Sequence, residues 1–397
     1  MRSFPLVALS AVLITSFLAP PSAKAKGSLY GKIYTDDGDV YTGAMRWDKN
    51  ENFWDDVLDA RKDKKVRAIS ARKEVKILGL KISKSGEWNS VRSEFSIPFG
   101  HIASIEPARG ERVDLELKSG EVIVVREGAD MGDSMRGLIV YDEEQGEVNL
   151  DWKSVDRIEF SGDSTNRDNQ RLYGTVQTRR AKFTGYIVWD RDESLVGDIL
   201  DGEDGGKKYK IPFAKIKHIR RKGSKASEIT LANGRTHVLR GTNDVNDENR
   251  GIDITVPGVG KVEVGWDQFR EVHFENPPGS LAYNEFDGGS LLHGTVETAD
   301  GDTFEGQIIW DNDEEYSWEA LNGETVGVDF AILFENIASI ERASRQAAEV
   351  VLHNGNTFIL EGSNDVDSDN KGIVVIEKDG SEVQIGWKEF HRATFRQ

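Results

Sequence analysis

The chain has 397 residues, with 69 acidic and 51 basic side chains, a formal charge of −18 and no cysteine. The lack of cysteine excludes disulfides, thiolate catalysis and zinc sites with cysteine ligands. The excess of acid repels phosphate backbones, so we expect no nucleic acid among the partners. A chain of this length can bury a stable core without covalent crosslinks.

The N-terminal residues 1–25 predict a secretory signal peptide. Arg2 supplies the positive charge, Leu6 to Leu18 form the apolar core, and Ala23-Lys24-Ala25 has the small-x-small pattern of a cleavage site. The alternative, a membrane anchor, is disfavoured because the apolar run is shorter than the roughly 20 residues that span a bilayer. We expect an exported protein, periplasmic or extracellular, with no transmembrane segment after cleavage.

One unit recurs three times along the chain. Its openings read LYGKIYTDDGDVYTGAMRWD, LYGTVQTRRAKFTGYIVWD and LLHGTVETADGDTFEGQIIWD, and its closings read GEVNLDWKSVDRIEF, KVEVGWDQFREVHF and SEVQIGWKEFHRATF. Internal similarity of this kind indicates a repeat architecture. The predicted division is repeat 1 at 27–160 with an insertion at 60–94, repeat 2 at 171–274 and repeat 3 at 290–395, with linkers at 161–170 and 275–289.

Within each repeat, short alternating segments are separated by Asp-Gly or Asn-Gly pairs, which are strong hairpin signals. These pairs are Asp37-Gly38, Asn233-Gly234, Asp300-Gly301, Asn354-Gly355 and Asp379-Gly380. Each half-repeat ends with apolar residues spaced by three, which predicts a single 3₁₀ turn between two strands. The sequence therefore predicts an all-β protein.

Five short strands with a 3₁₀ turn before the last resemble the small SH3-like or Sm-like β-barrel. The resemblance is one of fold and implies that each repeat is a pair of such five-stranded barrels. The two halves of a repeat are marginal in size when taken alone, so we expect them to share a core. The alternative is a β-propeller with one half-repeat per blade.

Six of the nine tryptophans occupy equivalent positions in the three repeats: Trp47, Trp189 and Trp310 near the openings, and Trp152, Trp266 and Trp387 near the closings. Exposed rows of tryptophan are typical of sugar-binding surfaces. The alternation of each strand, however, places these residues on the same face as aliphatic neighbours. We therefore expect core packing rather than carbohydrate binding.

The second half of each repeat contains a polar loop that is the best metal candidate in the sequence. Oxygen donors stand at alternate positions in repeats 2 and 3, as in calcium-binding loops; they are Asp244, Asn246 and Glu248, and Asp365, Asp367 and Asp369. The loops lack the turn glycine and the bidentate glutamate of an EF-hand, so a purely structural loop is the alternative and the one we favour. Repeat 1 carries Asp130, Gly132 and Ser134 there, and we expect no site in it.

Two further charged features stand out. An acidic cluster follows the first tryptophan of each repeat and is typical of a solvated strand end; its members are Asp48, Asn50 and Glu51, Asp190, Asp192 and Glu193, and Asp311, Asp313 and Glu314. The insertion at 60–94 is basic and occurs once, so it is the best candidate for an interaction surface. Its first cations are Arg61, Lys62, Lys64, Lys65, Arg67, Arg72 and Lys73.

The sequence contains no nucleophile elbow, phosphate-binding loop or His-Glu-x-x-His stretch, and its seven histidines show no ligand spacing. We expect a non-catalytic, exported interaction or scaffold module without a cofactor, whose partner is an unidentified protein or glycan. One alternative is a calcium- or carbohydrate-binding, adhesion-type protein that uses the Asn/Asp loops. The other is a hydrolase with a pair of carboxylates that no motif announces.

Overall fold

The structure is a computed structural model that describes residues 27–67, 75–77, 80–82, 88–108, 110–128, 130–162 and 170–396, with the backbone alone over 63–94. The predicted signal peptide at 1–25 lies outside the described residues, as do Arg72 and Lys73 and most of the first linker. Within the described residues, no helix is long and apolar enough to cross a membrane.

The described elements are antiparallel strands and short 3₁₀ turns, so the predicted all-β class is confirmed. Repeat 1 contains β1 (Tyr30–Thr35), β2 (Val40–Trp47), β3 (Val57–Arg67), β4 (Val75–Ile77), β5 (Leu80–Ile82), β6 (Trp88–Pro98), η1 (Phe99–His101), β7 (Ile102–Pro107), β8 (Arg112–Leu117), β9 (Val122–Arg126), β10 (Leu138–Asp142), β11 (Gly146–Leu150), η2 (Trp152–Ser154) and β12 (Val155–Phe160).

Repeat 2 contains β13 (Tyr173–Thr178), β14 (Lys182–Trp189), β15 (Ile199–Asp204), β16 (Lys207–Pro212), η3 (Phe213–Lys215), β17 (Ile216–Arg221), β18 (Ser227–Leu231), β19 (Thr236–Leu239), η4 (Asn243–Val245), β20 (Ile252–Val256), β21 (Gly260–Val264) and β22 (Phe269–Phe274). The second linker contributes η5 (Tyr283–Glu285). Repeat 3 contains β23 (His293–Thr298), β24 (Thr303–Ile309), β25 (Ala320–Thr325), β26 (Val328–Leu333), η6 (Phe334–Asn336), β27 (Ile337–Arg342), β28 (Ala347–Leu352), β29 (Thr357–Glu361), β30 (Ile373–Glu377), β31 (Glu382–Ile385) and β32 (Phe390–Phe395).

The local signals read from the sequence agree with these elements. Each of the five Asp-Gly or Asn-Gly pairs joins two hydrogen-bonded strands, and its glycine has a positive φ of 80–88°. The segments whose apolar residues are spaced by three form a 3₁₀ turn at η1, η2, η3 and η6. The two segments that begin at Trp266 and Trp387 form an ordinary turn instead. Gly43, Gly185 and Gly306 allow close strand approach, because a Cβ there would meet a carbonyl oxygen of the next strand at 2.0–2.2 Å.

The two halves of a repeat exchange hairpins. In repeat 2, β14 from the first half pairs with β20 from the second half, and β15 is bridged to β19 through Glu203 and Arg240. Repeat 1 pairs β2 with β10 and β3 with β9, and repeat 3 pairs β24 with β30 and β25 with β29. A half-repeat is therefore no structural unit, which does not fit the propeller alternative, and the expected closed barrels are not found among the described residues.

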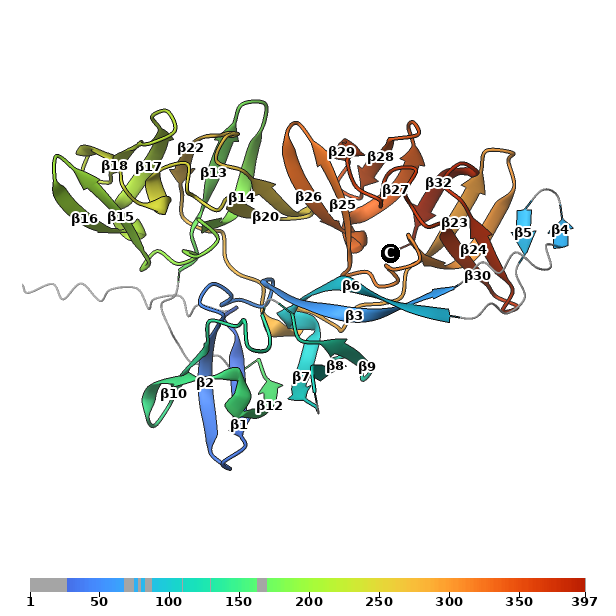
Figure 1. Ribbon diagram of the computed structural model, residues 1–397, viewed down its shortest axis with the longest axis horizontal. Helices are drawn as coiled ribbons and strands as arrows, with labels where there is room; N and C mark the ends of the chain where they lie inside the picture. Colours follow the sequence, from blue (N-terminus) through green and yellow to red (C-terminus); the bar gives the residue numbers. More distant parts are fainter. Residues whose placement is uncertain are drawn as a thin grey trace, which may run out of the picture.

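Repeats 2 and 3 form one continuous sheet of 18 strands, whereas the main sheet of repeat 1 has ten. The seam is β21 against β26, with Val262 opposite Phe330. In Figure 1 repeats 2 and 3 lie side by side, and repeat 1 packs beneath them with its β3–β6 ribbon running under repeat 3. This pairing gives each seam strand a hydrogen-bonded neighbour on both sides, which an edge strand lacks.

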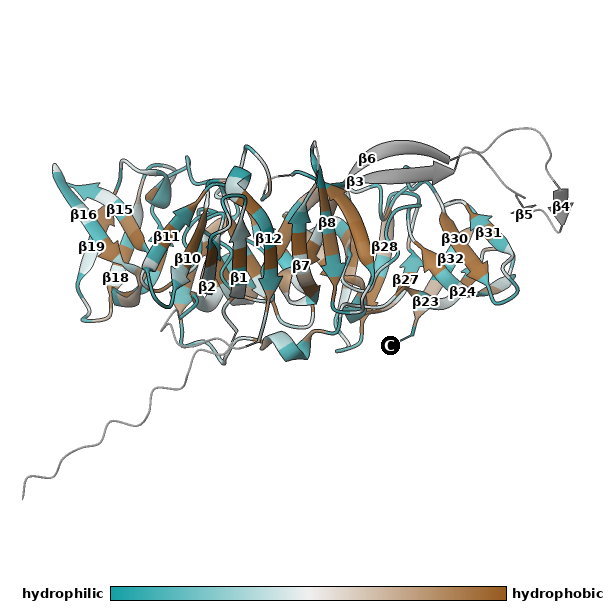
Figure 2. Ribbon diagram, turned by 90° about the horizontal axis from the view of Figure 1, so that it is seen from below, coloured by the Kyte–Doolittle hydropathy of each residue, from teal (hydrophilic) through white to brown (hydrophobic). Residues whose placement is uncertain are grey.

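The apolar positions of these strands form two cores. One spans repeats 2 and 3, and the other fills repeat 1 but also takes in Tyr316 and Trp318 from repeat 3. Figure 2 shows the apolar segments along the strands and the polar ones at the turns. The six equivalent tryptophans are all buried, at most 6% exposed, so the prediction of core packing is confirmed.

The second linker is docked rather than free. Tyr283 and Phe286 pack against the core of repeat 1, and Lys118 donates hydrogen bonds to both of their carbonyl oxygens. The Lys118 ammonium also lies 4.0 Å from the centre of the Tyr283 ring. The polar composition of this segment predicted only a connection, because apolar residues are sparse in it and their shared binding surface lies far away in the sequence.

The same loop carboxylate ties the repeats together in all three copies. Asp56, Asp198 and Glu319 each stand nine residues after the first tryptophan of a repeat, and each accepts two backbone N–H bonds that close its own loop. Each also pairs with a cation of another repeat: Asp56 with Arg171 at 2.7 Å, Asp198 with Arg46 at 3.1 Å, and Glu319 with Lys62. These acids were not among the predicted site residues, although aligning the three copies places them at one position.

Candidate functional site

The two acidic features seen separately in the sequence meet in the structure. In each repeat, the loop after the first tryptophan packs against the Asn/Asp loop of the second half and forms a carboxylate cluster. We define cluster 1 as Asp48, Glu51 and Asp130, cluster 2 as Asp190, Glu193 and Asp244, and cluster 3 as Asp311, Glu314 and Asp365. Because these acids are buried or half-buried, the expectation of a solvated strand end is wrong for them.

The first aspartate of each cluster sits in a strained turn. Asp48, Asp190 and Asp311 have φ of 40–51°, and the residue after each is left-handed as well. This region is costly for residues with a Cβ, although aspartate tolerates it better than most. The buried carboxylate offsets the strain by accepting the backbone N–H of Arg136, Arg250 or Lys371 and by pairing with the same side chain.

The aspartate of the second-half loop holds two elements together. Asp244 accepts the backbone N–H of Asp201 on Oδ2 at 2.5 Å, and its carbonyl oxygen accepts the indole N–H of Trp189 at 3.0 Å. Asp130 and Asp365 make the same two contacts, with Asp59 and Trp47 and with Asn322 and Trp310. These residues are therefore part of the framework of each repeat.

In each cluster the glutamate has a buried oxygen without a hydrogen-bond partner among the described residues. Oε2 of Glu51, Glu193 and Glu314 is buried and has no hydrogen-bond partner among the described residues. Burial, followed by repulsion from the neighbouring Asp244, raises the pKa of Glu193 to about 9. Burial likewise raises the pKa of Glu51 and Glu314 well above the usual value, with Asp130 and Asp365 as the next causes. Such a group stays protonated at neutral pH unless a cation replaces the proton.

Clusters 1 and 2 have the spacing of a cation site. One oxygen from each of their three carboxylates lies within 4.8 Å of the other two. A calcium ion bound at about 2.3–2.6 Å fits between oxygens at this separation. Fully ionised, each cluster has three negative charges against the single charge of Arg136 or Arg250, an excess that suits a divalent ion.

The metal ligands predicted from the sequence fall into two groups in the structure, those that enter a carboxylate cluster and those that do not. Asp244 and Asp365 enter the clusters, whereas Asn246 and Asp367 accept the backbone N–H of Glu248 and Asp369 in tight turns. Glu248 and Asp369 are exposed. Ligands at alternate loop positions are thus not brought together, because the loop turns at those positions. Repeat 1, where we expected no site, does have a cluster, since Asp130 meets the first-half loop.

The cations predicted to form an interaction surface also differ in their surroundings. Lys62 is paired with Glu319 and with Asp313, at 3.5 Å for the latter, so it serves the contact with repeat 3. Arg61 is exposed. For Lys64, Lys65 and Arg67 the described backbone lies in β3, whose pairing with β6 runs from Val57 opposite Pro98 to Arg67 opposite Trp88. Strands β3 and β6 therefore form a long two-stranded ribbon at the base of the insertion.

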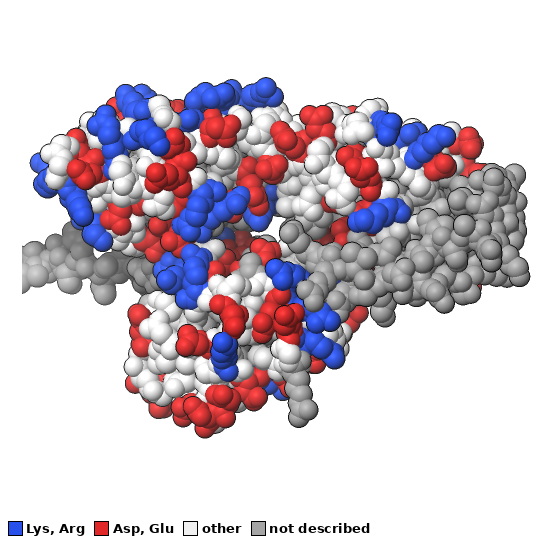
Figure 3. Space-filling model, in the orientation of Figure 1, with Lys and Arg blue, Asp and Glu red and all other residues white. Residues whose placement is uncertain are grey.

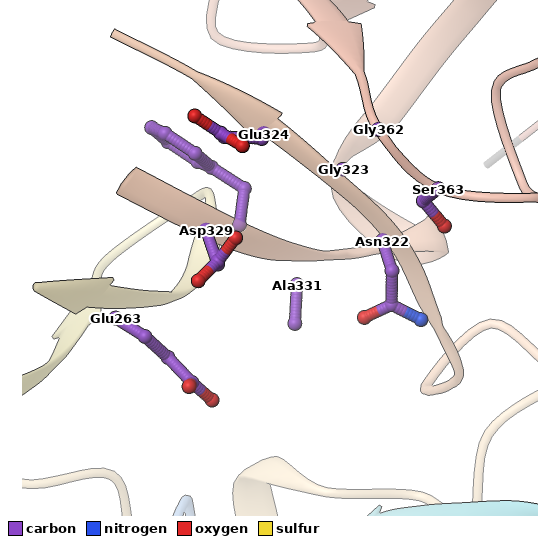
Figure 4. A pocket seen from close by; sticks show the side chains of 9 residues that line it. Glu263, Asn322, Gly323, Glu324, Asp329, Ala331, Gly362 and Ser363 are labelled. Carbon is purple, nitrogen blue, oxygen red and sulfur yellow. The ribbon is translucent and has the colours of Figure 1, made fainter. Parts of the chain in front are cut away.

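The surface has a second basic region and a shallow acidic depression. Figure 3 shows Lys and Arg gathered over the outer end of repeat 2, where β16 carries exposed Lys207, Lys208 and Lys210. The depression lies at the seam and has a volume of about 260 Å³. Figure 4 shows two of the acids that line it, Glu263 of β21 and Asp329 of β26, which are paired in register. That volume is below the roughly 300–1,000 Å³ of most small-molecule sites.

Comparisons with family models, with curated proteins and with solved structures give no match for this chain.

Proposed function

We propose that this protein is an exported, non-catalytic interaction scaffold, in which three repeats are clamped into one rigid body that presents basic surfaces to a partner. The observation that carries the proposal is the recurrent clamp, in which Asp56, Asp198 and Glu319 each pair with a cation from a repeat other than their own. Buried ion pairs of this kind fix the orientation of the repeats relative to one another. A partner that contacts more than one repeat at once requires such a fixed arrangement. For each repeat we propose two SH3-like units of five strands with exchanged hairpins.

The partner that these surfaces suit is acidic, either a protein or a glycan. The β3–β6 ribbon and the lysines of β16 are cationic features in an otherwise acidic chain, and neither is repeated in the other copies. A feature that occurs once is not required by the shared framework. Export to the periplasm or the extracellular space is part of the proposal and depends on the predicted signal at residues 1–25.

The test is a pull-down from an extracellular or periplasmic extract with the mature chain and two variants. One variant lacks residues 64–91 and joins Asp63 to Arg92 through Asn-Gly, which keeps Lys62 and Phe95 in place because Asp63 and Arg92 are paired. The other replaces Lys207, Lys208 and Lys210 with glutamine. We expect one of them to lose the captured partner while keeping the wild-type melting temperature. Capture that survives both changes would contradict the proposal.

A second candidate function, calcium binding, is favoured by the unpartnered Oε2 of Glu51, a residue only 9% exposed. The clusters, rather than the alternate loop positions, would supply the ligands. Bound ion would raise the melting temperature as mass action requires. Terbium offers a direct readout, because the indoles of Trp47 and Trp189 are hydrogen-bonded to cluster residues and can sensitise its emission.

The calcium test compares Glu51→Gln and Glu193→Gln with Glu248→Gln and Asp369→Asn as matched controls. We expect calcium and terbium to act on the wild type and both controls and to act less on the cluster variants. If the clusters bind only protons, calcium should leave the melting temperature of the wild type and of all four variants unchanged. Loss of binding in the controls instead would restore the alternate loop positions as ligands.

Carbohydrate binding and glycoside hydrolysis, the two remaining alternatives, find no support in the tryptophans or the carboxylate clusters. The tryptophans that would form a sugar-binding row are buried, and Asp190 and Asp311 are 0% exposed. A glycoside hydrolase needs both carboxylates to reach the scissile bond. The clusters therefore give no support to carbohydrate binding or hydrolysis.

A further inference from the structure

Two histidines and a glutamate meet on the surface of repeat 2, although they are far apart in the sequence. His218 of β17 lies directly opposite His273 of β22, and Glu271 is two residues before His273 on the same strand face. The imidazole rings are stacked, with centres 4.1 Å apart and planes within 8°. The histidines show no ligand spacing along the sequence, but strand pairing brings these two together.

The donor atoms converge. Nε2 of His218 lies 3.3 Å from Oε2 of Glu271, and Nε2 of His273 lies 3.6 Å from Oε1 of the same carboxylate. One ligand atom from each residue, a ring nitrogen of each histidine and a carboxylate oxygen of Glu271, lies within 4.8 Å of the other two. Ligands bound to zinc at about 2.0–2.1 Å in a tetrahedron are about 3.3–3.4 Å apart, which these separations approach.

The equivalent positions of the other repeats show that the fold does not need these residues. By strand register, repeat 1 has Ser104, Arg157 and Glu159 there, and repeat 3 has Ser339, Arg392 and Thr394. Neither set contains an imidazole. The two-histidine, one-glutamate arrangement is specific to repeat 2, within a framework that forms equally well without it.

We propose that His218, Glu271 and His273 form a surface binding site for a zinc-class divalent metal ion. Imidazole nitrogen with one carboxylate suits zinc and its neighbours in the first transition series, and not calcium or magnesium. The side chain of His273 is 53% exposed, so the remaining coordination position faces solvent.

Arg220 is the competitor for this site. Its Nε lies 3.2 Å from Oε2 of Glu271, and the guanidinium charge opposes a bound cation. The same side chain is half-exposed and lies 3.7 Å from Glu228, so it has a second carboxylate to turn to when Glu271 binds metal. Removing Arg220 should therefore strengthen metal binding, an effect that adventitious surface binding does not predict.

The experiment titrates Zn²⁺ into the metal-free mature chain by calorimetry, and Co²⁺ by visible absorption. We expect one Zn²⁺ bound with micromolar affinity at this site and a tetrahedral Co²⁺ spectrum. Loss of an outer-shell partner alone commonly weakens metal binding by about 10–100-fold, so His273→Ala and Glu271→Gln should each weaken it by at least about tenfold. Arg220→Gln should tighten it.

The matched control is His353→Ala, which removes an exposed histidine of repeat 3. It should bind Zn²⁺ like the wild type. Circular dichroism and melting temperature establish that each variant is folded, and the exposure of His273 makes its substitution tolerable. Absence of Zn²⁺ uptake, or uptake that is unchanged in both His273→Ala and Glu271→Gln, overturns the proposal; uptake at the carboxylate clusters would produce the second result.

Discussion

Arg171 and Asp56 form an ion pair across the boundary between repeats 2 and 1, with 2.7 Å between Nη2 and Oδ1. The Arg171 side chain is only 4% exposed, lies 2.5 Å from Asp55 as well, and stacks its guanidinium over the rings of Phe53 and Tyr186. This one cation therefore pairs with two carboxylates that are largely shielded from water, with side chains 13% and 10% exposed.

Replacing Arg171 with methionine should therefore destabilise the whole protein. Removing one member of a buried ion pair leaves the other charge uncompensated and costs about 3–5 kcal/mol. Urea unfolding followed by circular dichroism measures the effect. The control is Arg396→Ala, which breaks a pair with Glu305 whose members are both 62% exposed and which should cost at most about 1 kcal/mol. Equal effects of the two substitutions would contradict the clamp.

Proteolytic nicking of the linkers should not release separate repeats. Repeats 2 and 3 share a sheet through β21 and β26, and Tyr316 and Trp318 are buried in the core of repeat 1. After cleavage within 161–170, the two pieces should therefore elute together in size-exclusion chromatography. A fragment of residues 290–396 alone should unfold, because it exposes its seam strand and both aromatic side chains. Independent folding of that fragment would show that the repeats are autonomous.

Trp387→Ala should cost about 3–5 kcal/mol, as do other large-to-small changes in a core. The Trp387 ring is buried against Trp310 and Phe390, at centre distances of 6.5 and 5.5 Å. Differential scanning calorimetry measures the loss. Ile359→Ala, at an exposed apolar position of β29, is the control and should change stability little. A loss of less than about 1 kcal/mol for Trp387→Ala would contradict core packing.

Acid should loosen the contact between repeat 1 and the second linker. His101 is buried with its ring edge-on to Phe286, and burial lowers its pKa to about 4. The unfolded state binds a proton below about pH 6.5 and the folded state does not until about pH 4, so the contribution of His101 to stability falls as the pH drops through this window. One such group contributes a slope of at most about 1.4 kcal/mol per pH unit.

Measuring the free energy of unfolding between pH 7 and pH 4 checks this expectation. The variant His101→Phe removes the titrating ring but keeps a flat aromatic side chain against Phe286, so it should lose less stability than the wild type as the pH falls over this range. His353→Ala, at an exposed histidine, should retain the wild-type dependence. A pH profile that is the same in His101→Phe and the wild type would assign the acid sensitivity to other groups.

The sequence by itself determined the local structure of this protein. Asp-Gly and Asn-Gly pairs placed the hairpin turns because glycine adopts positive φ without strain. Alternation along the strands identified Trp189 and Trp310 as core residues, since side chains two apart share a face. These are short-range properties, and a single stretch of chain contains all the information they need.

Only the tertiary structure decided what lies across from what. Hairpin exchange between half-repeats, the seam of β21 and β26, and the pairing of Arg171 with Asp56 all join residues distant in the sequence. The same is true of the candidate sites: Asp244, a candidate ligand in its own loop, packs against Glu193, and His218 meets His273 through strand register. Because charge repulsion, burial and metal geometry depend on distance in space, the chemistry of these groups follows from the packing of the repeats.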